Sequence, residues 1–250
     1  MCRTSSLTAA QIDKNTFKNV PVGNLPEDMN MINGTWRFTV KVDKKTGLVT
    51  RFKARFCARG DMQVAGVDYF DTSSPVVSYT TLRLLFALAC LFSWIILSID
   101  VVTAFLNADI EEEVYMKPGK GFPKVDGMIW RLLKGVYGTC QASRAWWKLF
   151  NSWITRDPEI RPSTIDPCLY IAVCLTDSSL FCLLLLYVDD VIAMGNSPSY
   201  TREVLNRIQS KFDTTGGEEF TQGLGLECEY DRDAGTLKLH QTRWRGQSGS

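Results

Sequence analysis

The feature that most constrains this chain is the segment LFCLLLLYVDDVIAMG, in which two long apolar runs flank the adjacent acids Asp189 and Asp190. Apolar runs of this length are typical of buried strands, and the short polar break between them predicts a tight hairpin. The preceding segments, CLYIAVC and the polar turn LTDSS, add a third strand. The sequence therefore predicts a buried antiparallel meander with a pair of acids at its second bend.

A third acid, Asp100, interrupts the apolar segment WIILSIDVVTAFL. An ionised carboxylate in such a strand costs several kcal/mol unless it is paired or bound to a cation. An Asp-Asp pair at a turn is by itself more often a solvated hairpin tip, but two separate violations of the apolar pattern favour a shared site. If the two segments are neighbours, three carboxylates converge, and their repulsion requires a divalent ion. Oxygen ligands without His or Cys select Mg²⁺ or Mn²⁺ over zinc, and two such ions about 3.5 to 4 Å apart form the polymerase arrangement.

The composition argues against several other chemistries. The single histidine, His240, cannot form a His-rich zinc site, and no nucleophile motif surrounds it. The eight cysteines form no C-x-x-C pair and lie mostly in apolar runs, which is typical of reduced thiols in an intracellular compartment. The N-terminus has no apolar signal core, and the longest apolar stretch, Leu84 to Ile99, is shorter than the roughly 20 residues that span a bilayer. We therefore expect a soluble protein with no membrane partner.

Charge is unevenly distributed, although the net charge is only +1. Residues 1–60 carry 11 basic and 4 acidic side chains, a balance of +7, and the remainder balances at −6. The basic residues concentrate in a predicted β-hairpin, TWRFTVKV and LVTRFKARFCARG, joined by a turn at KKTG. Such a hairpin suits phosphate contacts, although a solvated amphipathic hairpin gives the same pattern. Residues 1–35 are polar and lack periodicity, which predicts a tail or linker.

Three segments have the apolar spacing of helices. YTTLRLLFALACLF has the apolar density of a buried helix, with Ser78 or Thr80 as its cap. QASRAWWKLFNSWITR and SPSYTREVLNRIQSKF are amphipathic helices with one apolar face each. A last hairpin joins LGLECEY to TLKLHQ. With 250 residues, 45% of them hydrophobic, the chain fits one large domain or two small ones.

Taken together and in order, five segments resemble the reverse transcriptase domain of copia-type LTR retrotransposon polyproteins. They are RFKARFCARGDMQVAGVDYFDTSSPVV, SIDVVTAFLNADIEEEVYM, LLKGVYGTCQASRAWW, DPCLY and LLLLYVDDVIAMG, and the resemblance runs from about Trp36 to Gln241. It implies an α+β fold, the palm and fingers of a right-hand polymerase with an antiparallel palm sheet, truncated before the thumb. The implied division is a polar tail or linker at 1–35, fingers at 36–75 and 108–145, palm at 76–107 and 146–240, and a truncated tail at 241–250.

The resemblance also implies roles for single residues. Asp100, Asp189 and Asp190 match the family's catalytic, metal-binding aspartates, with Mg²⁺ or Mn²⁺ as the cofactor. Lys53 and Arg55 match basic residues that hold the incoming triphosphate, for which generic nucleic-acid contact or simple solvation is the alternative.

Two further residues match positions that contact the nucleotide. Gln141 matches a glutamine that lies against the sugar and base, and its alternative role is helix capping. Phe105 matches an aromatic that stacks beneath the deoxyribose and excludes a 2′-hydroxyl, and its alternative role is core packing. Because strand residues alternate faces, the role of Phe105 requires the backbone to turn after Thr103.

The implied reaction is RNA-directed DNA polymerisation, a two-metal transfer of a nucleotide from a dNTP to a primer 3′-hydroxyl. The implied partners are an RNA template, a DNA primer, dNTPs, and the missing thumb and RNase H portions of a longer polyprotein; the implied location is the cytoplasm, including virus-like particles. Three departures stand against this. Cys140 replaces a basic residue near the nucleotide, Thr215-Gly216-Gly217 stands where the family usually has Asp-Leu-Gly, and Gly223 replaces an aromatic in a hairpin that resembles a primer grip. The main alternative is a catalytically silent relic that at most binds nucleic acid. An unrelated acidic-cluster metal binder would explain the aspartates but not the ordered motifs.

Overall fold

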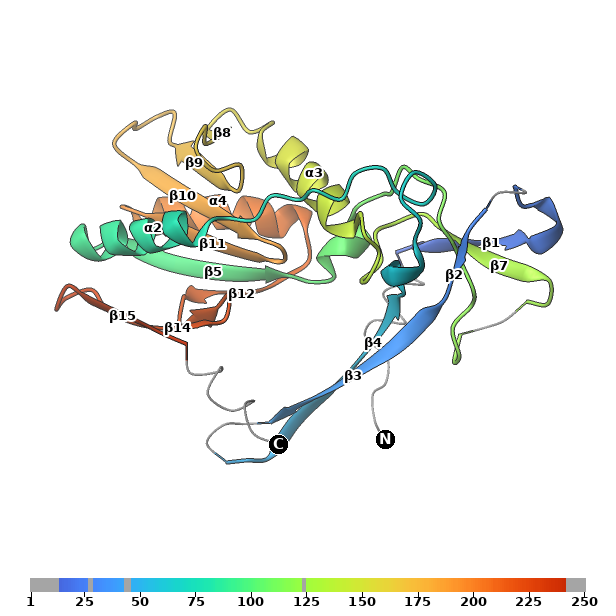
Figure 1. Ribbon diagram of the computed structural model, residues 1–250. Coiled ribbons are helices and arrows are strands. Elements are labelled where there is room, and N and C mark those ends of the chain that lie inside the picture. The colour runs from blue at the N-terminus through green and yellow to red at the C-terminus, as the bar shows by residue number, and fades with distance from the viewer. Residues whose placement is uncertain (1–13, 27–28, 43–45, 123–124, 242–250) are drawn as a thin grey trace. The chain divides into compact units, whose positions relative to one another are not determined.

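The computed structural model describes residues 14–26, 29–42, 46–122 and 125–241, and the chain divides into two compact units (Figure 1). The first unit comprises Met1–Ser74 and Thr103–Leu149, and the second comprises Pro75–Val102 and Phe150–Ser250. Sheets dominate the described residues, which also contain three α-helices, so the expected mixture of helix and sheet is confirmed. None of the described helices has the length and apolar character needed to cross a membrane.

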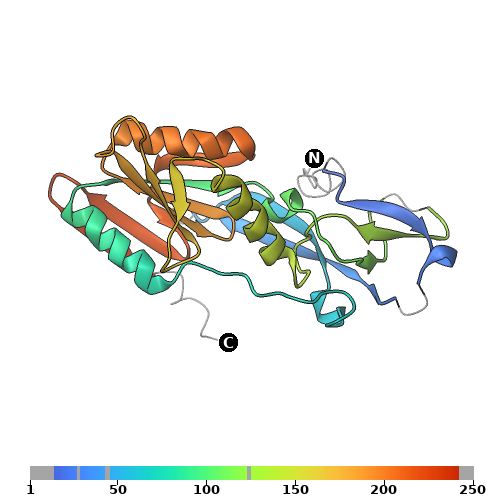
Figure 2. The ribbon, with the colours of Figure 1, turned by 90° about the horizontal axis from the view of Figure 1, so that it is seen from above.

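A six-stranded antiparallel sheet forms the centre of the second unit, in the order β12-β5-β11-β10-β9-β8; its strands are labelled in Figure 1, and Figure 2 shows the sheet from above. Its strands are β5 (Ile95–Val101), β8 (Ile160–Pro162), β9 (Leu169–Val173), β10 (Phe181–Tyr187), β11 (Asp190–Gly195) and β12 (Thr214–Glu219). Leu97, Leu184 and Ala193 in the central strands are completely buried. This burial explains the nearly continuous apolar runs, and the meander predicted from them is confirmed as β9-β10-β11.

Two helices of the second unit begin at side-chain caps. In α2 (Tyr79–Leu91) the hydroxyl of Ser78 accepts a hydrogen bond from the Thr81 N–H, so Ser78 is the cap of the two that the sequence allows. In α4 (Pro198–Lys211) the cap is Ser197. The following Pro198 occupies the first turn, where a missing N–H costs nothing.

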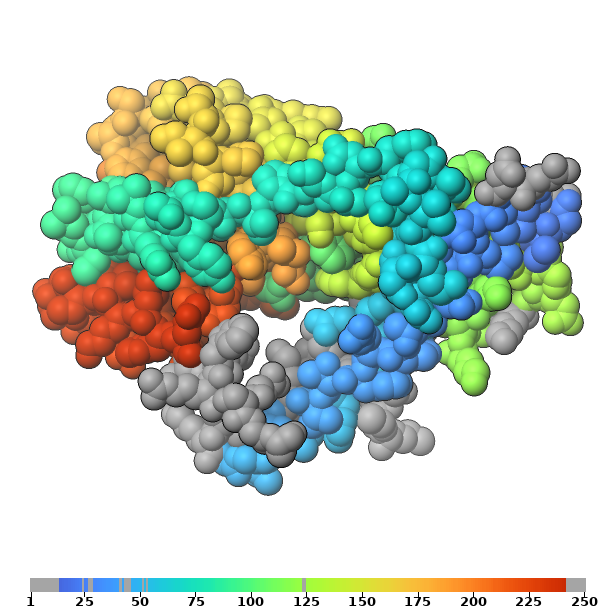
Figure 3. All heavy atoms as spheres, in the orientation of Figure 1, coloured from blue at the N-terminus to red at the C-terminus, as the bar shows by residue number. Residues whose placement is uncertain are grey.

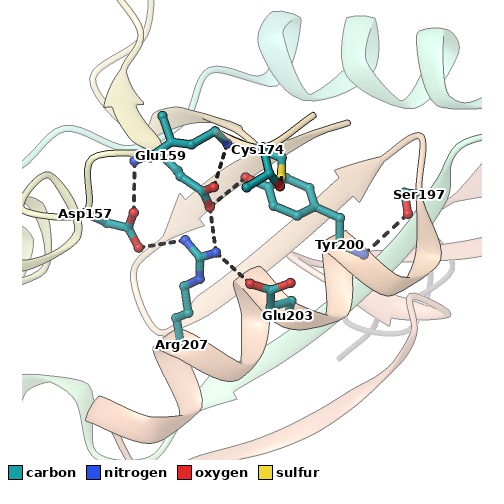
Figure 4. Close-up of polar contacts among 9 residues, drawn as sticks. Asp157, Glu159, Cys174, Ser197, Tyr200, Glu203 and Arg207 are labelled. Atoms are coloured by element: carbon teal, nitrogen blue, oxygen red, sulfur yellow. Dashed lines mark hydrogen bonds and ion pairs between the residues drawn. The ribbon is translucent and has the colours of Figure 1, made fainter. Parts of the chain in front are cut away.

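Helix α4 is fixed to the loop before β8 by one guanidinium (Figure 4). Arg207 forms ion pairs with Asp157 at 2.8 Å, Glu159 at 2.6 Å and Glu203 at 2.8 Å. The Tyr200 hydroxyl also donates to Glu159, at 3.2 Å. A planar guanidinium has enough donors to serve all three carboxylates, so a single side chain connects the helix to the sheet.

The last predicted hairpin is confirmed as a separate three-stranded sheet. It consists of β13 (Gln222–Gly223), β14 (Leu226–Asp231) and β15 (Thr236–His240). The space-filling view shows α2 lying along it (Figure 3). The Tyr230 hydroxyl joins the two, since it donates to the carbonyl of Ala89 in α2 at 2.8 Å.

The first unit contains a four-stranded sheet and a separate hairpin. The sheet has the order β1-β7-β6-β2, with strands β1 (Phe17–Pro21), β2 (Met31–Ile32), β6 (Tyr115–Met116) and β7 (Met128–Leu132); only β2 and β6 are parallel among its described pairs. The hairpin pairs β3 (Gly34–Val42) with β4 (Val49–Ala58), as the alternating pattern predicts. Helix α3 (Ala142–Ile154) spans the boundary between the units, and the amphipathic helix predicted there is confirmed.

The prediction of a polar tail or linker at residues 1–35 is wrong for its described part. Strand β1 pairs with β7, the ring of Phe17 stacks on Trp130 with centroids 3.9 Å apart, and Ile32 is completely buried. Strands of five and two residues are too short to show periodicity, and their partners lie about a hundred residues away in sequence. Residues 1–13 and 242–250, which include most of the expected C-terminal tail, lie outside the described residues.

The chain passes from the second unit to the first at Thr103, whereas the resemblance places residues up to 107 with the palm. Thr103 has φ 52° and ψ 47°, a left-handed conformation, and the short 3₁₀ helix η3 (Ala104–Asn107) follows it. In η3, Leu106 is completely buried in the core of the first unit, together with Met116 and Trp130. The turn after Thr103 that the role of Phe105 requires is therefore confirmed.

Candidate active site

Asp100, Asp189 and Asp190 lie at one end of the six-stranded sheet. Asp190 is directly opposite Asp100 in the ladder of β5 and β11, so the two side chains share one face of the sheet. Asp189 precedes β11, and its carbonyl accepts a hydrogen bond from the Val101 N–H at 2.8 Å. The structure therefore brings together the three acids that the sequence predicts to converge.

The turn that presents Asp189 is strained. Tyr187 pairs with Asp190, which leaves Val188 and Asp189 as the two turn residues, and Val188 has a φ of 58°. Such hairpin turns favour glycine or asparagine where φ is positive, and a β-branched residue there costs on the order of 1–3 kcal/mol. The strain is sustained because the strands on both sides of the turn are fixed by neighbouring strands. Backbone strain of this kind concentrates at functional sites.

The electrostatics of the cluster reflect crowding of like charges. Burial raises the pKa of Asp190 to about 6, and repulsion from Asp189 and from Asp100 adds to the effect of burial. A hydrogen bond from the backbone N–H of Leu224 acts in the opposite direction. The ionised form of Asp190 is therefore disfavoured unless positive charge approaches.

Leu224 belongs to the hairpin that resembles a primer grip, but a leucine in a short apolar hairpin carries no functional signal of its own. Gly223 pairs with Leu226, which leaves Leu224 and Gly225 as a two-residue turn with φ of 55° and 75°. Although it lies in a turn, the Leu224 side chain is buried, with 9% of its surface exposed. The neighbouring Gly223 is also constrained, since a Cβ there would lie 2.6 Å from the ring of Phe220. Phe220 thus occupies the space beside the glycine that replaces the family's aromatic.

The donor set fits a hard divalent cation, since the cluster offers carboxylate oxygens and its repulsion would be relieved by two positive charges. In the described parts of the chain, no group of three or more His, Cys, Asp and Glu side chains is arranged as a complete metal site. The carboxylates would have to close around an ion, and their role as metal ligands stays a prediction.

In the first unit, the hairpin β3–β4 has one basic face. Arg37 is directly opposite Arg55, Thr39 is opposite Lys53, and the next basic pair is Lys41 with Arg51. Like charges directly opposite each other, as at Arg37 and Arg55, are destabilising, so this position favours a bound anion. The side chains of Lys41, Arg51 and Lys53 lie outside what the structure describes, and only their backbone positions in β3 and β4 are known.

Arg55 and Phe105 meet on the ring of Tyr137, a residue that sequence reasoning did not select. The guanidinium carbon of Arg55 lies 5.8 Å from the centre of this ring, within the range of a cation–π contact. The ring of Phe105 lies 4.6 Å from the same centre, and Phe105 is 9% exposed. Gly138 lets this loop approach the end of β4, because a Cβ there would lie 2.2 Å from the Ala58 carbonyl.

Gln141 immediately precedes α3 and is buried, with 3% of its surface exposed. Its Oε1 accepts a hydrogen bond from Gln63 at 3.1 Å, and its Nε2 donates to the carbonyl of Asp68 at 2.9 Å. The carboxylate of Glu112 lies 3.5 Å from the same nitrogen. The residue is therefore held by other parts of the first unit, and it is not simply a helix cap.

The site residues predicted from the sequence therefore fall into two groups, one in each unit. Asp100, Asp189 and Asp190 gather in the second unit. The first unit contains Lys53, Arg55, Phe105 and Gln141, of which Arg55 and Phe105 share Tyr137 as a neighbour.

Comparisons with known proteins identify relatives over most of the chain. The family model for "Reverse transcriptase (RNA-dependent DNA polymerase)" matches residues 15–247. The retrovirus-related Pol polyprotein from transposon TNT 1-94 of Nicotiana tabacum is 33% identical over 92% of the chain, and that from transposon RE1 of Arabidopsis thaliana is 32% identical over 94%. The truncated transposon Ty1-A Gag-Pol polyprotein of Saccharomyces cerevisiae is 29% identical over 72% of the chain.

These relatives are much longer than the chain. The matched region covers 17% of the tobacco polyprotein, 16% of the Arabidopsis polyprotein and 15% of the yeast one. The chain therefore spans about a sixth of the length of the curated relatives it matches.

Proposed function

The chain belongs to the reverse transcriptase (RNA-dependent DNA polymerase) family of copia-type LTR retrotransposon Pol polyproteins, and from this membership we propose that it catalyses RNA-directed DNA synthesis. The reaction would be attack of a primer 3′-hydroxyl on a deoxynucleoside triphosphate, with release of pyrophosphate. The single observation that carries the proposal is the direct opposition of Asp100 and Asp190 across β5 and β11, with Asp189 in the adjacent turn.

The two units would divide the work. The second unit is the palm, because its sheet carries the aspartates. The first unit, with the basic face of β3–β4, is the fingers.

The aspartates would hold Mg²⁺ or Mn²⁺, which when bound supplies activation of the 3′-hydroxyl and neutralisation of the phosphates. Their own contribution is to concentrate negative charge at one end of the sheet, where the β5–β11 ladder fixes Asp100 and Asp190 and the adjacent turn holds Asp189. The strained turn at Val188 aims Asp189 toward the same end of the sheet.

The nucleotide would be held by residues of the first unit. Lys53 and Arg55 bind the triphosphate by charge-assisted hydrogen bonds, and the contact with Tyr137 limits the directions that Arg55 can take. Phe105 presents a flat ring to the sugar and excludes a 2′-hydroxyl, while Gln141 lies against the sugar and base. The RNA template and DNA primer would bind the basic face of the hairpin β3–β4 through their phosphates.

The test is primer extension on an RNA template with dNTPs and Mg²⁺. We expect the wild-type chain to extend the primer, and Asp190→Asn to lower the rate by at least about 100-fold, the size of effect seen when one group that stabilises a transition state is removed. The matched control is Asp233→Asn, which removes an exposed acid from the β14–β15 loop.

Two results would contradict the proposal. Equal extension by wild type and Asp190→Asn would place the chemistry elsewhere. Salt-sensitive binding of primer–template without extension, under conditions in which the chain is folded, would favour the silent relic that at most binds nucleic acid.

A further inference from the structure

A buried polar cluster in the first unit surrounds Gln141, and its members come from segments far apart in the chain. Gln63 is 9% exposed and follows the 3₁₀ helix η2 (Gly60–Met62), while Asp68 is 1% exposed and lies five residues later. Asn30 comes from the N-terminal segment just before β2. Buried amides are stable only when their donors and acceptors are satisfied, so the pairing within this cluster fixes each amide in one orientation.

Gln63 uses both ends of its amide. Its Oε1 accepts a hydrogen bond from the backbone N–H of Cys140 at 2.7 Å, and its Nε2 donates to Oε1 of Gln141 at 3.1 Å. The backbone of Cys140 therefore sets the orientation of Gln63, and Gln63 sets the orientation of Gln141.

The other end of the Gln141 amide is fixed by Asp68. The carbonyl of Asp68 accepts from Nε2 of Gln141 at 2.9 Å. The Asp68 carboxylate in turn accepts from Nδ2 of Asn30 at 2.6 Å and from the Val64 N–H at 2.7 Å, so the residue cannot rotate freely.

We propose that Gln63 is a positioning residue for the nucleotide, acting through Gln141. An amide is required at position 63 because it must accept from a backbone N–H and donate to Gln141 at once. A glutamate would keep the length and the acceptor but would place one carboxylate oxygen against the oxygen of Gln141. The proposal rests on the proposed function, in which Gln141 lies against the sugar and base of the dNTP.

The experiment compares Gln63→Glu with wild type in two readouts. The first is the dNTP concentration that traps a primer–template whose primer ends in a dideoxynucleotide, which measures nucleotide binding without chemistry. We expect Gln63→Glu to raise the apparent Kd for the dNTP roughly tenfold, since a lost or misdirected hydrogen bond to a bound group costs about a factor of ten. Affinity for primer–template alone should stay within about twofold of wild type, as it should for the control Asp126→Asn on the exposed surface of the first unit.

A double-mutant cycle separates positioning from general loss of structure. In a Gln141→Ala background, Gln63→Glu should have no further effect on the Kd for the dNTP. An equal effect with and without Gln141 would overturn the proposal, as would an unchanged Kd in the single variant.

The second readout does not depend on nucleotide binding. The side-chain NH₂ signals of Gln141, assigned by their absence in Gln141→Met, should be protected from solvent exchange in wild type and lose protection in Gln63→Glu. Unchanged protection would overturn the role of Gln63. If wild type forms no trapped complex while protection is lost as expected, the proposed function fails and the pairing of Gln63 with Gln141 stands.

Discussion

Asp190 combines burial with two acidic neighbours, and this has a cost for folding that can be measured. Its pKa is raised to about 6, so at pH 7 the folded chain carries an ionised group that would be more favourable in the unfolded state. We expect Asp190→Asn to increase the free energy of unfolding by about 1 kcal/mol at pH 7 in the absence of divalent ions. This free energy is well below the one that corresponds to the whole pKa shift, because partial exposure of Asp190 screens the repulsion. Urea denaturation measures it, and a loss of stability in Asp190→Asn would show that the repulsion is already compensated.

Divalent cations should turn the destabilising repulsion among the three aspartates into a stabilising interaction. A ligand that binds only the native state stabilises it, by about 2.7 kcal/mol at a concentration 100 times its Kd. We expect Mg²⁺ or Mn²⁺ to raise the melting temperature of wild type and to raise it less in Asp189→Asn. Thermal unfolding with and without the ion measures these melting temperatures. An equal rise in wild type and in Asp189→Asn would place the ion outside the three aspartates.

Phe105 has two possible roles that a single substitution separates. Its ring packs on Tyr137, so Phe105→Val should destabilise the first unit by about 1–3 kcal/mol whichever role is correct. If the ring also excludes a 2′-hydroxyl, the variant should incorporate ribonucleotides more readily relative to deoxyribonucleotides, because the steric barrier is smaller. Competition between the two nucleotides in primer extension gives this ratio. An unchanged ratio would assign Phe105 to core packing alone.

At the scale of elements, the hairpin β3–β4 concentrates charge on one face. Binding of primer–template should weaken steeply with salt, because the bound phosphates release counterions. Replacing both Lys53 and Arg55 by alanine should reduce the slope of log K against log salt by roughly one to two units. Arg161→Ala in β8 is the control, since it removes an exposed basic residue from the other unit. Binding that does not depend on salt would mean that this face has another partner.

The connection between α4 and the loop before β8 should respond to acid. The N–H of Leu175, the guanidinium of Arg207 and the hydroxyl of Tyr200 all lower the pKa of Glu159 below its ordinary 4.5. A carboxyl with a lowered pKa contributes stability above its unfolded pKa, and this contribution is lost as the pH falls through the folded value.

Arg207→Met tests this contribution. At pH 7 it should cost about 2 kcal/mol, because three carboxylates lose a shared partner. The difference between wild type and variant should be constant above about pH 5 and should shrink below about pH 4, as followed by urea denaturation at each pH. A difference that is the same at pH 3 and pH 7 would show that Arg207 acts by packing and not by charge.

At the scale of the whole molecule, the sequence predicted best what depends on apolar patterning over long segments. The meander, the capped helix after Ser78 and the meeting of Asp100 with Asp190 all follow from buried runs that acids interrupt. The roles of β1 and β2 could not be predicted, because strands this short acquire meaning only from distant partners. Tyr137 and Leu224 were missed for a related reason, since an aromatic or a leucine becomes a site residue only through what lies next to it.

The chain crosses between the two units after residues 74, 102 and 149, so neither unit is a continuous stretch of sequence. This has a consequence for biosynthesis. Strand β1 cannot pair until β7 has left the ribosome, more than a hundred residues later; at about 5–20 residues per second this is a wait of roughly 5–20 seconds. The second unit also begins while the first is unfinished. Phe17 and Ile32 are therefore exposed to the cell's chaperones and proteases before their burial sites exist. The first unit has all of its residues once Leu149 has been made, whereas the second unit still needs the chain from Phe150 onward.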